Sequence, residues 1–250
     1  MKNNILIEVC CGSVDDCIVA QKASADRIEL NHALEMGGMT PSLATLKLAK
    51  EYVNIPICCM VRPRGYGFNY TDVQFQVMKN EAKDLIEAGA DGIVFGFLNE
   101  DSTINIERTK EMVSIIKPKE AIFHKAFDST KNLEESIKIL IDCGIDRVLT
   151  SGGAVSLEII EGCKILGKLN DKYKDMIEIL PGGGVREHNV IDILKESKSN
   201  QIHMTAKHLV LDKSTMNYGT KDFCETNHSY VATEYKQLKA IMDKIEKSSL

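Results

Sequence analysis

The chain has 250 residues with 31 Lys and Arg against 36 Asp and Glu, which gives a formal net charge of −5. This mild acidity, without a Lys/Arg-rich run, speaks against a nucleic-acid partner. Apolar runs stay well short of the roughly 18 residues that a membrane span needs, and a short apolar strand follows Asn4 directly, so we expect neither a membrane segment nor a signal peptide. The apolar share of 44% predicts a folded globular core rather than a disordered chain.

The cysteines indicate a reducing compartment. There are eight, and no two of them form a C-x-x-C pair, so we expect neither a structural zinc site nor a thioredoxin-like site. A chain of this size has no need of disulfides to fold, and no secretory segment is recognised, so we expect reduced thiols and a cytoplasmic location.

Short β-rich runs alternate with stretches of helical period along the chain. The expected strands are Ile5–Cys10, Arg27–Leu30, Pro56–Val61, Gly92–Gly96, Ala121–His124, Arg147–Thr150, Ile177–Pro181 and Gln201–Met204. The expected helices include residues 41–52, 72–88, 133–143, 186–195 and 231–247, and residues 208–230 are expected to form a loop before the last helix.

Eight strand–helix units in a chain of this length predict a single-domain α/β fold, the (β/α)8 TIM barrel, over residues 1–250. The alternative is an open doubly wound sheet. It is disfavoured because the first strand runs into CCGSVDD, which lacks the G-x-G-x-x-G fingerprint of a dinucleotide site.

Alternation along the strands predicts which polar side chains enter the barrel. On the first strand Ile5, Ile7 and Val9 form the apolar face, so Glu8 and Cys10 are expected to point inward. The same rule places these further residues inward: Glu29, Asn31, Cys58, Met60, Arg62, His124 and His203.

Polar residues from several strands at the mouth of a barrel are typical of a catalytic site. The candidate acid–base residues are Glu8, Glu29, His124 and His203, with Asp128 four residues after His124 as its orienting partner. The same histidines and glutamates could instead hold a divalent metal ion, or form a buried network in which Arg27 or Arg62 neutralises the carboxylates.

Two glycine-rich loops and an arginine pair predict an anion site. The segments TSGGA and PGGGVR follow the sixth and seventh strands, and their backbone N–H groups could converge on an oxyanion. Arg62 and Arg64 add positive charge after the third strand. The alternative is that the loops are tight turns and the arginines tie down their own loop. The candidate anion-binding glycines are Gly152, Gly153, Gly182, Gly183 and Gly184.

Sulfur atoms form another candidate constellation. Cys10, Cys58 and Met60 point inward by parity, and Cys11 lies at the end of the first strand, where it could also turn in. Thiolate and thioether donors select Cu(I). The alternative is that these side chains only fill the core.

Several motifs, taken in order, resemble the CutC family of copper homeostasis proteins. They are EVCCGS, ADRIEL, EMGGMTPS, RPRGYGFNYTD, DGIVFG, FHKAFD, DRVLTSGG, PGGGVR and IHMTA, and they run from Ile5 to about Ala206. The resemblance implies a (β/α)8 barrel, a cytoplasmic location, a homo-oligomer, which we expect to be a dimer, and a role in Cu(I) binding or copper tolerance.

When the family motifs are carried over residue by residue, the resemblance implies that Cys10 is a copper ligand. Asn31 stands where the family has its second proposed copper cysteine, so Cys11 is the remaining candidate for a second sulfur ligand. Lys125 stands where the family usually has Arg. The main expectation is therefore a copper homeostasis protein. The alternative is an enzyme that acts on a small anionic or phosphorylated metabolite at the barrel mouth, so the expected partner is a metal ion or a small molecule.

Overall fold

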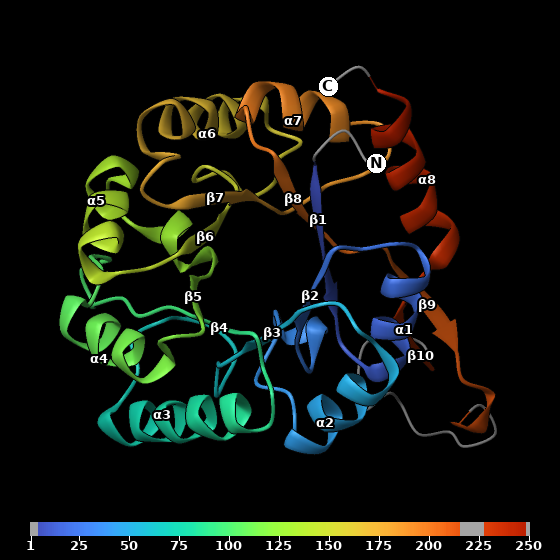
Figure 1. The fold of residues 1–250 in the computed structure, drawn as a ribbon, viewed down its shortest axis with the longest axis horizontal. Helices are drawn as coiled ribbons and strands as arrows, with labels where there is room; N and C mark the ends of the chain where they lie inside the picture. The colour runs from blue at the N-terminus through green and yellow to red at the C-terminus, as the bar shows by residue number, and fades with distance from the viewer. Residues whose placement is uncertain (1–4, 216–227, 249–250) are drawn as a thin grey trace.

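The computed structural model describes residues 5–215 and 228–248, and within them eight parallel strands form a barrel (Figure 1). The strands run in the order β7-β6-β5-β4-β3-β2-β1-β8, and a bridge between Gly182 and His203 brings the two ends together. The predicted TIM barrel is confirmed. The strand bounds are β1 Leu6–Cys11, β2 Arg27–Leu30, β3 Ile57–Met60, β4 Gly92–Phe95, β5 Glu120–Phe123, β6 Arg147–Thr150, β7 Glu178–Pro181 and β8 Gln201–Met204.

Helices surround the strands as an outer ring (Figure 1). Polar side chains begin several of them: the Ser42 hydroxyl accepts from the backbone N–H of Thr45, and Thr71 and Gln74 form a capping box. The helix bounds are α1 Val14–Lys22, α2 Leu43–Tyr52, α3 Asp72–Glu87, α4 Ile106–Ile116, α5 Leu133–Cys143, α6 Ile160–Tyr173, α7 Val190–Ser197 and α8 Tyr235–Lys247. Among the described residues, none of these helices is long and apolar enough to cross a membrane.

The apolar core has two parts because strand side chains alternate between two faces. The larger part lies between the strands and the helices and includes Ile7, Val9 and Cys11. The smaller part lies inside the barrel and consists of Cys58, Met60, Val94 and Ile122. Buried polar side chains also lie in the barrel interior, and these build the candidate site.

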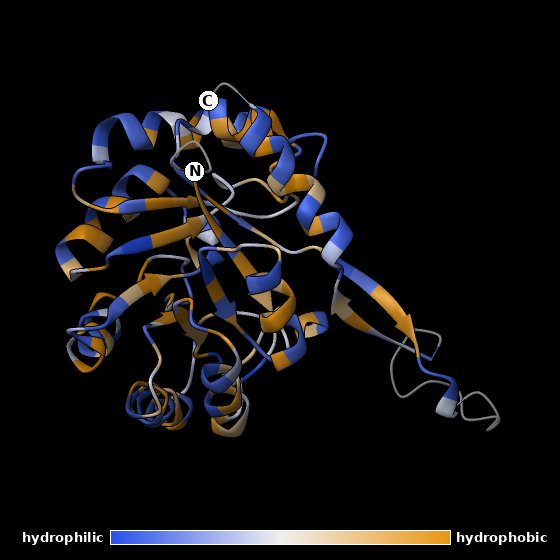
Figure 2. Ribbon diagram, turned by 45° about the vertical axis from the view of Figure 1, so that its right-hand side comes forward, coloured by the Kyte–Doolittle hydropathy of each residue, from blue (hydrophilic) through white to orange (hydrophobic). Residues whose placement is uncertain are grey.

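The C-terminal region differs from the sequence prediction. The expected loop at residues 208–230 contains strand residues at both ends, because β9 (Lys207–Leu211) pairs antiparallel with β10 (Ser229–Thr233). The middle of that expected loop lies outside the described residues. Helix α8 begins at Tyr235 rather than at the predicted residue 231, because β10 extends to Thr233. This hairpin projects away from the barrel (Figure 2).

Candidate functional site

A cavity of about 380 Å³ lies at the carboxyl ends of the barrel strands, where barrel enzymes bind their ligands. Its lining brings together five of the sequence candidates, Cys10, Glu29, Arg62, His124 and His203. The other lining residues are Asn31, Leu34, Gly37, Gly38, Met60, Phe68, Lys125 and Leu149. Side chains that are far apart in the chain therefore meet at one mouth.

Glu8 lies beneath this cavity, within a buried ion-pair network. Its carboxylate accepts from Arg27 Nε, and its other oxygen lies 2.7 Å from His203 Nδ1. Burial alone would raise the pKa of Glu8, but Arg27 and the hydrogen bond with His203 hold that pKa at about 2. Glu8 is therefore a charged positioning group for His203.

His203 lies between two carboxylates. Its Nδ1 contacts Glu8, and its Nε2 is 3.9 Å from Glu29 Oε2. Burial would lower the pKa of His203, yet the two carboxylates raise it above the ordinary value, which favours the imidazolium. Burial also raises the pKa of Glu29, with the Glu8 charge adding to the effect.

Three potential metal ligands converge at this point. One ligand atom each from Cys10, Glu29 and His203 lies within 4.8 Å of the others, and all three residues are buried. Burial and the nearby Glu29 charge raise the pKa of the Cys10 thiol well above its ordinary value. Asn31 Nδ2 donates to Cys10 Sγ at 3.4 Å and to Glu29 Oε2 at 2.8 Å, so the amide ties two of these residues together.

Cys11 does not join Cys10, so the prediction that these two cysteines share a metal site is wrong. Strand β1 continues through Cys11, and alternation turns this side chain to the outer core, where its Sγ lies 3.7 Å from the Val9 carbonyl oxygen. The sulfur of Cys58 belongs to the small inner core below the mouth. Met60 brings a thioether to the cavity lining instead.

Arg62 and His124 face the cavity from the β3–β5 side. The Nη1 group of Arg62 donates to the carbonyls of Met36, Gly37 and Gly38, which leaves its Nε–H for another partner. His124 Nδ1 accepts from the backbone N–H of Ala126 at 3.2 Å, so Nε2 carries the proton of the neutral ring. Burial, together with the Arg62 charge, lowers the pKa of His124 to about 3 and keeps the ring neutral.

Buried polar atoms without a partner in the protein concentrate at this cavity. Among the described residues there are five such side-chain atoms, and four of them belong to residues that line the mouth. Buried polar groups are normally hydrogen-bonded, so this concentration indicates a site built to receive a ligand. The four atoms are Glu29 Oε1, Asn31 Oδ1, Arg62 Nε and His124 Nε2.

Asp128 does not orient His124, and this sequence prediction is corrected. Its carboxylate accepts from Thr150 Oγ1 at 2.6 Å and from the backbone N–H groups of Ser151 at 3.0 Å and Gly153 at 2.9 Å. Lys125 Nζ lies 2.9 Å from the same carboxylate. The turn at Lys125–Ser129 therefore carries Asp128 to the loop after β6, and an internal carboxylate occupies one predicted anion cradle.

Among the other predicted anion groups, the glycines and Arg64 have structural roles, whereas Arg62 lines the cavity. Gly152 N donates to Thr150 Oγ1, and Gly182 N donates to the Thr150 carbonyl. Gly183 and Gly184 have φ values of +108° and +76°. These values fit the tight turn that was the alternative to an anion site in the sequence analysis. Arg64 turns onto its own loop, where it donates to the carbonyls of Gly65 and Asn69, and it lies outside the cavity lining.

Sequence reasoning missed Gly38 and Phe68 as parts of the mouth. Gly38 has φ +83°, and a Cβ there would collide with Asn31 Oδ1, so the EMGGM segment needs glycine to pack against the site. Phe68 stands between two functional side chains: its ring centroid is 4.9 Å from that of His124 and 5.5 Å from Arg62 Cζ. The consecutive glycines were the available signal for the first of these.

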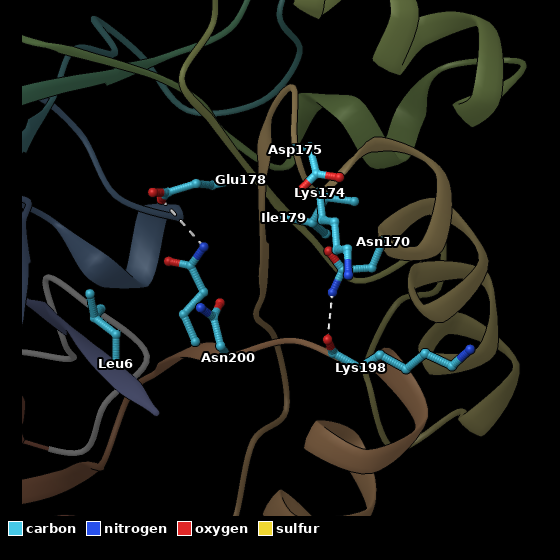
Figure 3. A pocket seen from close by; sticks show the side chains of 9 residues that line it. Leu6, Asn170, Lys174, Asp175, Glu178, Ile179, Lys198 and Asn200 are labelled. Carbon is cyan, nitrogen blue, oxygen red and sulfur yellow. Dashed lines mark hydrogen bonds between the residues drawn. The ribbon is translucent and has the colours of Figure 1, made fainter. Parts of the chain in front are cut away.

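A second cavity, of about 490 Å³, lies at the opposite, amino-terminal end of the strands (Figure 3). Glu178 accepts there from Gln201 Nε2 at 3.3 Å, and Asn170 Nδ2 donates to the Lys198 carbonyl at 2.8 Å. Because this end of a TIM barrel generally serves stability, we assign this cavity no ligand.

Comparisons with known proteins agree with the motifs. Residues 5–208 match the CutC family. A CutC family protein of Treponema denticola is 43% identical over 203 residues, which cover 81% of this chain and 82% of that protein. The human copper homeostasis protein cutC homolog is 38% identical over 82% of this chain and 74% of its own length. The crystal structure of CutC from Streptococcus agalactiae superposes with a TM-score of 0.76 at 32% identity, covering 80% of this chain and 98% of that one.

Proposed function

This chain belongs to the CutC family, and we propose that it takes part in copper homeostasis by binding copper as Cu(I) at the barrel mouth. The observation that carries the proposal is the buried cluster of Cys10, Glu29 and His203, whose ligand atoms lie within 4.8 Å of one another. The human and mouse relatives are both named copper homeostasis proteins.

The donor set fits a soft metal ion. Cys10 supplies a thiolate once its proton leaves, and Met60 brings a thioether to the same lining. Glu8 fixes His203 through Nδ1, which leaves Nε2 for the metal once the imidazolium loses its proton. Copper binding would therefore release protons from Cys10 and His203, and its affinity should fall as the pH is lowered.

Changes at residues 10 and 31 test this site directly. Asn31 Nδ2 is 3.4 Å from Cys10 Sγ, so Asn31→Cys should place a second thiolate beside the first. A second ligand on the same scaffold adds a bond without a second loss of translational freedom, so we expect Cu(I) affinity to rise at least tenfold (roughly 1.4 kcal/mol). Cys10→Ser should nearly abolish binding. Anaerobic titration against a Cu(I) chelator measures both changes.

Cys11→Ala is the matched control, because Cys11 neighbours Cys10 in the chain but lies in the outer core. We expect it to keep the affinity of the unchanged protein. Equal affinity in Cys10→Ser, Asn31→Cys and the unchanged protein would show that the mouth is not a copper site.

We further propose a cytoplasmic location and a homodimer. All seven cysteines in the described part of the chain are free and buried, which suits a reducing compartment. The projecting hairpin carries apolar side chains in solvent on both faces: Leu209 is 61% and Leu211 50% exposed on one, and Tyr230, which pairs with Val210, is 55% exposed on the other. Exposed apolar patches of this kind mark protein–protein contacts.

Charged substitutions on the hairpin test the dimer. Light scattering should report the mass of two chains for the unchanged protein and of one chain for the double variant Leu209→Lys/Leu211→Lys. Val155→Lys is the control, because Val155 is 90% exposed on the barrel rather than on the hairpin. A dimer that survives the double variant, or a monomeric unchanged protein, would contradict association through the hairpin.

A further inference from the structure

We propose that the mouth also binds a small organic hydroxy acid, whose carboxylate meets Arg62 and His124 and whose hydroxyl faces Glu29 and Asn31. The proposal goes beyond copper, because its donors, Arg62 and His124, are not part of the cluster of Cys10, Glu29 and His203, whereas its acceptors, Glu29 and Asn31, adjoin the thiol. It rests on the four unpartnered buried atoms, on the charge of the lining and on the apolar walls.

The donor side comes from two different strand ends. Arg62 Nε and His124 Nε2 are buried N–H groups without a partner in the protein. The residues Arg62 and His124 are only 7% and 4% exposed. The ring of Phe68 packs against both, which fixes them as neighbours. Two unpartnered N–H donors on residues that line one cavity suit the oxygens of a carboxylate.

The acceptor side comes from β2 and the residue after it. Glu29 Oε1 and Asn31 Oδ1 are buried oxygens without a hydrogen-bond donor, while Glu29 Oε2 is already bonded to Asn31 Nδ2. A carboxylate ligand without a hydroxyl group offers these two oxygens no hydrogen-bond donor. A ligand with a hydroxyl group would donate to them, and leaving a buried acceptor unmet costs about 1–3 kcal/mol.

The charge and the shape of the cavity narrow the class of ligand further. Arg62 and Lys125 line the cavity against one carboxylate, Glu29, so the charges of the lining favour an anion. Leu34, Met60, Phe68 and Leu149 give the cavity apolar walls, which suit a carbon skeleton rather than an inorganic ion. Its volume of about 380 Å³ suits a small molecule.

Calorimetric titration of the metal-free protein tests the proposal with lactate, propionate and inorganic phosphate as probes. Lactate and propionate share a three-carbon carboxylate, and only lactate has the hydroxyl. We expect lactate to bind at least tenfold more tightly than propionate and than phosphate. Equal binding of lactate and propionate would overturn the assigned hydroxyl contact, tighter phosphate binding would overturn the organic acid, and no binding of any probe at millimolar concentration would overturn the site.

Two arginines in one loop give a matched pair of variants. Arg62→Lys keeps the charge but removes the Nε–H, and we expect lactate affinity to fall about tenfold or more. Arg64→Lys makes the same change on an arginine that bonds its own loop outside the cavity, and lactate affinity should stay unchanged. Thermal unfolding of both variants shows whether the barrel is intact. Equal losses in the two variants, or no loss in either, would overturn the assigned contact.

His124→Phe separates this proposal from the copper site. It keeps a ring against Phe68 but removes the Nε2–H donor, so lactate binding should fall about tenfold while Cu(I) affinity stays unchanged. Loss of lactate binding with Cu(I) affinity retained supports the hydroxy-acid site whatever the outcome at Cys10. Unchanged lactate affinity in this variant would overturn the role of His124.

Discussion

Replacing Glu8 by glutamine should lower the free energy of unfolding by about 3–5 kcal/mol, as expected when one partner of a buried ion pair is removed. The substitution leaves Arg27, which is 5% exposed, with Gln201 as its remaining side-chain hydrogen-bond partner among the described residues. It also removes the carboxylate that contacts His203 Nδ1. Chemical denaturation at pH 7 measures the loss.

Glu120→Gln is the matched control for this change. Glu120 accepts from Arg147 Nη1 at 3.0 Å, but Arg147 keeps Glu178 at 2.7 Å from its Nε, so a second carboxylate remains. Glu120 is also 45% exposed as a side chain, and we expect its loss to change stability far less. A similar loss in both variants would mean that Glu8 is an ordinary ion-pair partner rather than the anchor of the barrel interior.

The carboxylate of Glu8 also predicts how the stability of the protein depends on pH. The pKa of Glu8 is held at about 2 in the folded protein against an ordinary value of 4.5, so the unfolded chain takes up the proton first as the pH falls. Its contribution, about 3 kcal/mol, is complete above pH 4.5 and is lost as the pH falls from there towards 2. The stability difference between the unchanged protein and Glu8→Gln should therefore shrink over that interval. A constant difference would contradict the depressed pKa.

The sequence was informative about the mouth because strand alternation is a strong local rule. Alternation predicted that Glu29, Arg62, His124 and His203 point into the barrel. All four line one cavity although they come from separate strands. The same rule explains the error at Cys11, where alternation was expected to lapse. Strand β1 runs on through Cys11, so this side chain faces the helices while Cys10 faces the mouth.

The remaining differences depend on contacts that spacing does not encode. Asp128 follows His124 by four residues, but the intervening turn carries it to the loop after β6. The glycines at 152 and 153 predict accessible N–H groups. Their spacing does not show that the carboxylate of Asp128 already accepts from one of them. The partners β9 and β10 are separated by a long segment without a short hairpin turn signal, so their pairing could not be read from the sequence.

Asp128→Ala should be strongly destabilising, with a loss of about 3 kcal/mol or more, because it leaves the N–H groups of Ser151 and Gly153 and the Thr150 hydroxyl without their acceptor. The cradle would then be open to an external anion. Added formate or acetate should raise the melting temperature of Asp128→Ala more than that of the unchanged protein, whose own carboxylate fills this place.

Asp101→Ala provides the control for this effect. Asp101 also accepts from a backbone N–H and a hydroxyl, both of Thr103, but its side chain is 57% exposed, so water replaces it and the change in stability should be much smaller. Neither formate nor acetate should act specifically on that variant. If the Asp128 variant is as stable as the Asp101 variant, the carboxylate is not what holds the loop after β6. If it is destabilised but added carboxylates protect it no more than the unchanged protein, the vacated N–H groups do not form an anion cradle, and the glycines at 152 and 153 serve the turn alone.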